Sequence, residues 1–124
     1  MSDFSPMFRR PRRKSEAHRA FVAKLPCLVP GCRSRSGIQA AHLRTAALHL
    51  GKRQSGMAET ADDCWVVPLC VDHHLNDPKR AQHSMNEMEF WRGHGIDPFP
   101  IALALFAHSG NEEVCRDIIR RAAL

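Results

Sequence analysis

Two short motifs of metal-binding residues constrain the fold of this chain more than any other feature. Cys27 and Cys32 flank a Leu-Val-Pro-Gly segment, and Cys70 is followed three positions later by His73. A Pro-Gly pair favours a tight turn, and a Cys-x-x-His spacing can be closed by another turn. Each motif can therefore present both of its donors to one ion, and together they match a closed structural zinc site of Cys₃His type. The alternative is two unrelated turns that carry buried thiols.

The cysteine content favours metal ligands over disulfides. The chain has 5 Cys, an odd number, and no apolar run long enough for a secretory signal or a membrane span. We therefore expect a cytoplasmic protein with no membrane partner. In that reducing compartment, clustered Cys and His residues are more often metal ligands than disulfides. Cys64 and Cys115 lie outside the two motifs and are expected to be buried thiols.

Apolar patterning predicts a small α+β domain around the motifs. The segment 64–70 is rich in valine, contains a tryptophan and predicts a brief buried strand. A second strand is expected over 38–44, with His42 near its end. His18 is expected on the surface of the first helix. The helices are expected after Ser, Asn or Asp caps, over 15–25, over 87–92 up to Gly93, from 98 to Gly110, and over 111–124.

The length and charge of the chain indicate one domain with a nucleic-acid partner. We divide its 124 residues into a disordered basic tail over 1–14, a zinc-binding domain over 15–110 and a C-terminal helix over 111–124 that packs on the domain. The net charge of +5 favours a polyanion such as DNA. A merely solubilising tail is the alternative. The residues expected to contact phosphates are Arg9, Arg10, Arg12, Arg13, Lys14, Lys52 and Arg53.

The sequence also holds more imidazoles than one zinc site requires. His42, His74 and His83 remain after the Cys₃His set is filled. An ion held by a few imidazoles keeps coordination positions open for water and substrate. On a basic chain, such an ion beside a histidine base is an arrangement that can hydrolyse a phosphodiester. The alternative is that these histidines are surface residues or ligands of the same zinc in another register.

The order of these motifs resembles a known family. After the two cysteines come Ala-Ala-His-Leu-Arg at 40–44, Asp-Asp-x-Trp-x-x-Pro-Leu-Cys-x-x-His-His at 62–74, Gln-His at 82–83 and Gly-Ile-Asp-Pro at 95–98. Over roughly residues 25–105, this order resembles phage and prophage nucleases related to the HNH, or ββα-metal, endonucleases. It is similar to the RecA-dependent phage nuclease in its zinc-and-HNH layout. The resemblance implies a small zinc-stabilised ββα-metal core flanked by helices.

The resemblance also implies roles for individual residues. His42 matches the general base at the end of the first strand, and Asp63 stands near the place of the central Asn that positions the base. Arg44 is expected on the same face as His42, as a further catalytic residue. His74 and His83 match ligands of a catalytic ion, which would be Mg²⁺, Mn²⁺ or Zn²⁺.

Three positions depart from the pattern of that family. Ala41 stands where many HNH sites have an acidic residue or a second histidine, so His42 is either the base or a metal ligand. Asp63 replaces the central Asn, and His73 replaces the more usual fourth cysteine of the structural site. The implied function is a metal-dependent endonuclease acting on DNA, as a monomer or a dimer. The alternative is a non-catalytic, zinc-stabilised DNA-binding module.

Overall fold

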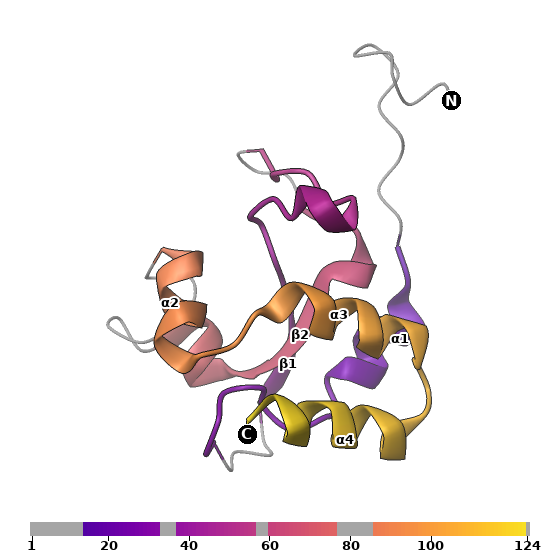
Figure 1. Ribbon diagram of the computed structural model, residues 1–124. Coiled ribbons are helices and arrows are strands. Elements are labelled where there is room, and N and C mark those ends of the chain that lie inside the picture. The colour runs from indigo at the N-terminus through magenta and orange to yellow at the C-terminus, as the bar shows by residue number, and fades with distance from the viewer. Residues whose placement is uncertain (1–13, 33–36, 57–59, 77–85, 124) are drawn as a thin grey trace.

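The computed structural model describes residues 14–32, 37–56, 60–76 and 86–123, and it places helices around a small sheet (Figure 1). Within these residues, β1 (Ile38–His42) and β2 (Val66–Cys70) form a two-stranded antiparallel sheet. The predicted α+β class is therefore confirmed. The helical elements are α1 (Glu16–Val22), η2 (Leu48–Leu50), η3 (Asp63–Trp65), the π-helical turn η4 (Asp72–Asn76), α2 (Glu87–His94), α3 (Pro98–Ala107) and α4 (Glu112–Ala122).

Strand β2 is buried along its whole length, as the valine-rich sequence predicts. Its Pro68 lies opposite Ala40 of β1, and the Pro68 carbonyl accepts a hydrogen bond of 2.8 Å from the N–H of Leu28. The carbonyl and the nitrogen of one residue point to the same side of a strand. The missing N–H of Pro68 therefore faces away from β1 and removes no bond between the strands. The segment that contains Leu28 follows this edge, which is how Cys27 reaches the end of β2.

The predicted helix caps are confirmed, while some predicted helix ends are wrong. The side chains of Ser15, Asn86, Asp97 and Asn111 each accept a hydrogen bond from a backbone N–H in the first turn of the following helix. Helix α2 continues through Gly93 and ends at Gly95, which adopts the left-handed conformation with φ 69°. A glycine inside the last turn is tolerated there because the left-handed cap comes two residues later.

The core lies between the sheet and helices α2, α3 and α4. Phe90 and Trp91 of α2 are buried, as predicted, together with Leu105 of α3. Helix α4 packs against α3, and its innermost residues are Cys115 and Ile119. Cys115 is thus the core thiol that the sequence predicts. No helix of the described residues is both long enough and apolar enough to cross a membrane.

Three side chains are placed differently from their predicted environments. His18 is 1% exposed, because its position on α1 turns it inward, where its ring meets Phe106 edge-on. Lys52 is also buried and donates to the carbonyl of Arg53, since a backbone bridge between Ala47 and Lys52 folds the loop back on itself. Lys52 is therefore not presented to a phosphate backbone. Cys64 is only partly buried, at the edge of the core.

Candidate metal centre and histidine site

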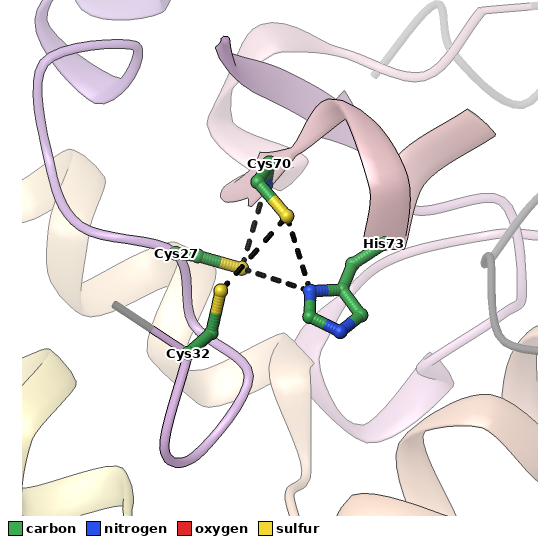
Figure 2. A group of neighbouring side chains, drawn as sticks. All are labelled: Cys27, Cys32, Cys70 and His73. Carbon is green, nitrogen blue, oxygen red and sulfur yellow. Dashed lines mark hydrogen bonds between the residues drawn. The ribbon is translucent and has the colours of Figure 1, made fainter. Parts of the chain in front are cut away.

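The two predicted ligand motifs meet at one point beyond the end of β2. The donor atoms of Cys27, Cys32, Cys70 and His73 all lie within 4.8 Å of one another (Figure 2). The Cys32 and Cys70 Sγ atoms are 3.9 Å apart, and His73 Nδ1 lies 3.6 Å from Cys27 Sγ and 3.1 Å from Cys70 Sγ. Residues from two distant segments therefore form a single donor group.

This group fits a tetrahedral metal ion such as zinc. With Zn–S bonds near 2.3 Å and a Zn–N bond near 2.05 Å, tetrahedral geometry requires S···S edges of about 3.8 Å and S···N edges of about 3.5 Å. The Cys32–Cys70 and Cys27–His73 distances of 3.9 and 3.6 Å match these edges, whereas the Cys70–His73 distance of 3.1 Å is shorter than the S···N edge. The set of three thiolates and one imidazole is also one that zinc favours. The cluster can therefore hold such an ion.

Local structure explains how each motif presents its donors. Val29 accepts a hydrogen bond from the N–H of Cys32, and Gly31 adopts φ 81°, so the Pro-Gly pair forms the predicted tight turn. Cys70 is the last residue of β2, and η4 then turns the chain so that His73 faces back toward it. Both turns arise from residues close in sequence, which is why spacing alone could predict them.

The pKa of the Cys27 thiol is strongly raised. Burial raises its pKa to about 12, although the backbone N–H of Cys70, whose nitrogen lies 3.4 Å from the sulfur, opposes this shift. Without an ion, this thiol keeps its proton at neutral pH. A metal ion that binds here must therefore displace that proton, so metal affinity falls with acidity.

A second group of polar side chains forms at the other end of the sheet. His42, at the end of β1, places Nε2 2.8 Å from Oδ1 of Asp63 in η3. The Asp63 side chain is 1% exposed, whereas that of His42 is 22% exposed. Because a carboxylate only accepts, His42 donates from Nε2, and Nδ1 is the basic nitrogen of the neutral ring. The pairing predicted between a base and a residue that positions it is therefore present as a hydrogen bond.

The structure adds partners of Asp63 that the sequence does not reveal. Oδ2 of Asp63 accepts from the backbone N–H of Ser15 at 2.6 Å and from Nε of Arg19 at 2.9 Å. Ser15 caps the N-terminus of α1 and Arg19 lies in its last turn, both more than forty positions from Asp63 in sequence. Asp63 thus joins α1, η3 and β1.

His74 has its own orienting contact, separate from that of His42. Its Nδ1 lies 2.6 Å from Oε1 of Gln39 on β1. The amide oxygen accepts a hydrogen bond, so the proton of the neutral ring lies on Nδ1. Nε2 then has the lone pair that can bind a metal ion, the arrangement typical of a metal-binding histidine. Within the part of the chain that the structure describes, however, the Cys₃His set is the one group of three or more His, Cys, Asp or Glu side chains placed to share a metal ion. His42 and His74 are not gathered into a second cluster there.

Other predicted site residues have different surroundings. The guanidinium of Arg44 donates to the carbonyl of Gly56, and the backbone N–H of Arg44 donates to the carboxylate of Glu87. Arg44 thus ties the segment after β1 to a loop and to α2. Arg53 and Lys14 are exposed. The remaining predicted residues, Arg9, Arg10, Arg12, Arg13 and His83, lie outside the described residues.

Comparison of the chain with protein-family models, with curated proteins and with solved structures finds no match. One site is a cluster of thiols and an imidazole that could hold a metal ion. The other is an imidazole held by a buried carboxylate at the end of a strand.

Proposed function

We propose that this protein is a metal-dependent endonuclease that hydrolyses phosphodiester bonds of DNA, with an HNH-like core of phage or prophage type. The observation that carries the proposal is the hydrogen bond between His42 Nε2 and the buried Asp63 carboxylate. A carboxylate in this position fixes the imidazole tautomer and stabilises the imidazolium that forms when the ring takes a proton. Such a pair is suited to a general base.

In this proposal, the metal-binding cluster has a structural role. A zinc ion held by Cys27, Cys32, Cys70 and His73 would fasten the segment after α1 to the end of β2. A small domain gains much from such a link, because its hydrophobic core is limited. The cluster is closed by four protein ligands, which leaves no position for substrate.

Hydrolysis would then depend on His42 and on a divalent ion near His74. His42 would take a proton from the attacking water at Nδ1, while Asp63 holds Nε2 and the ring orientation. His74, oriented by Gln39, would provide Nε2 as one ligand of the ion, with His83 as another. When bound, a divalent ion stabilises the negative charge that develops on the scissile phosphate. The basic charge of the chain supports DNA as the substrate.

A plasmid-nicking assay tests this proposal. With Mg²⁺ or Mn²⁺, zinc-loaded protein should nick supercoiled DNA, and His42→Ala should lower the rate about 10²- to 10⁴-fold. His74→Ala should also abolish nicking, and both variants should retain wild-type zinc content. His49→Ala is the matched control, because His49 is an exposed histidine of η2. Equal nicking by wild type, His42→Ala and His74→Ala would refute the assignment.

A specific observation favours the second candidate, a non-catalytic zinc-stabilised DNA-binding module. Gln39, which holds His74, and His42 lie three positions apart on β1, so the pleat directs them to opposite faces of the sheet. In this candidate, the His42–Asp63 pair links α1 to the sheet, and His42 and His74 do not act together in catalysis. DNA binding without nicking in the presence of Mg²⁺, Mn²⁺ and Zn²⁺ would favour this candidate.

A further inference from the structure

Helix α1 is not part of the predicted ββα-metal core. It nevertheless contacts Asp63, the carboxylate that accepts a hydrogen bond from His42. Arg19 donates from Nε to Oδ2 of Asp63 at 2.9 Å, and His42 meets Oδ1 of the same carboxylate at 2.8 Å. The N–H of Ser15 donates to Oδ2 as well. Both oxygens of Asp63 are therefore engaged, one toward α1 and the other toward β1.

Among the residues that the structure describes, Arg19 brings a permanent positive charge to this group. The titratable groups around the carboxylate include His42 on β1 and, on α1, Arg19 and His18. Burial lowers the pKa of His18, although the charge of Asp63 opposes the shift, so His18 is neutral at pH 7. Glu16 lies 4.0 Å from the Arg19 guanidinium, but its side chain is exposed. Water therefore screens the effect of its charge on Arg19 and Asp63. Arg19 is thus the fixed counter-charge of Asp63.

We propose that Arg19 is a positioning residue for His42 and acts through Asp63. Its guanidinium would hold the carboxylate so that Oδ1 faces the imidazole, and would offset part of the charge that His42 senses. The catalytic consequence rests on the proposed function of His42 as a base, whereas the effect on the imidazole itself does not.

The direction of the effect follows from the charges. A lone carboxylate stabilises an adjacent imidazolium and raises the pKa of the ring. A guanidinium on the other oxygen opposes this, because it repels the imidazolium and draws the carboxylate charge toward itself. Loss of Arg19 should therefore make His42 hold its proton to higher pH. A base that stays protonated is unavailable, so the acid side of a pH–rate profile should move upward.

The test uses the zinc-loaded full chain and follows the histidine ring signals by NMR from pH 5 to pH 9. Arg19→Gln should raise the His42 titration midpoint by about half a pH unit or more. Arg19→Lys keeps the charge and should restore much of the wild-type midpoint. Lys24→Gln is the matched control, since it removes an exposed positive charge just beyond α1, and should leave the midpoint unchanged.

A measurement on the wild type keeps the proposal testable if Arg19→Gln does not fold. Above its titration midpoint, the neutral His42 ring should carry its proton on Nε2, because Nε2 donates to Oδ1 of Asp63, and the ¹⁵N shifts of the ring report this tautomer. A neutral His42 ring protonated on Nδ1 would overturn the proposal. So would an unchanged or lowered His42 midpoint in folded Arg19→Gln.

Nicking assays then separate this inference from the proposed function. If both hold, Arg19→Gln should nick about threefold more slowly on the acid side of the profile and recover at higher pH, in step with the NMR midpoint. If the midpoint moves but wild type does not nick, the endonuclease proposal fails and the coupling of Arg19 to His42 stands. If wild type nicks but the midpoint does not move, the role of Arg19 fails alone.

Discussion

The Cys₃His cluster lies at one end of the small sheet, and a network of Asp63 with Ser15, Arg19 and His42 lies at the other end. We call the second group the Asp63 network, and the two groups link their segments by different means. The cluster joins two local pairs, Cys27 with Cys32 and Cys70 with His73, through donors that a metal ion can bind together. The network joins α1, η3 and β1 through one buried carboxylate. The cluster depends on an ion from solution, while the network is made of the chain alone.

This difference shows where each region obtains its stability. Without an ion the buried Cys27 thiol keeps its proton, so the cluster stabilises the fold when an ion is bound. Asp63 instead has donors on both oxygens, which offset the cost of burying its charge. Removing the ion should thus affect the first region most, and removing the carboxylate charge should affect the second without loss of metal.

The largest expected effect comes from Cys70→Ser, which removes a ligand that also ends β2. Zinc content should fall from about one ion per chain to none, and the free energy of unfolding should drop by roughly 5 kcal/mol or more. Metal analysis and thermal melting measure the two effects. Cys64→Ser is the control, because Cys64 is a thiol outside the cluster and should keep the zinc. A Cys70→Ser protein with full zinc content and a wild-type melting temperature would contradict the structural role.

The next effect is expected from Asp63→Asn, which keeps the shape of the side chain and removes its charge. Arg19 and His42 then lose a charged acceptor, and the free energy of unfolding should fall by about 2 kcal/mol, since Arg19 is partly exposed. Chemical denaturation measures this loss, and zinc content should stay at the wild-type value. Asp62→Asn, next in sequence and only partly buried, should change stability less. Equal losses in the two variants would show that Asp63 is no special link.

The smallest effect concerns the pH dependence of stability through His18. Burial lowers the pKa of this histidine in the folded state below its ordinary value of 6.5. The unfolded chain therefore binds a proton more readily, so the contribution of His18 is complete above pH 6.5 and declines as the pH falls below it. Wild type should lose about 3 °C more in melting temperature between pH 7.5 and 5.5 than His18→Phe does.

His94 is a second histidine that contributes to the pH dependence of stability. Burial also lowers its pKa, with a smaller contribution from His73, and its effect on stability has the same sign. Because His94 is present in both proteins, its contribution cancels in the difference between wild type and His18→Phe. Identical pH dependence in the two proteins would mean that His18 titrates as freely in the folded state as in the unfolded chain.

Sequence reasoning succeeded where the determining contacts are local. The strands, the four caps and each of the two ligand pairs, Cys27 with Cys32 and Cys70 with His73, follow from turn residues, apolar runs and ligand spacing within a few positions. It failed for His18 and Lys52, because burial of a polar side chain depends on which distant segment covers it. The ends of α1, α2 and α3 were also misplaced, since packing decides how far a marginal last turn extends.

The sequence by itself determined that Cys27, Cys32, Cys70 and His73 can share an ion, because a local turn brings together the two ligands of each motif. The tertiary structure alone decided that Asp63 is shared between Arg19 and His42 and that Gln39 holds His74. These contacts join segments more than twenty positions apart, and their partners are common polar residues without a spacing rule. Only the packing of α1 and η3 against the sheet buries the carboxylate, and burial is what makes its donors necessary.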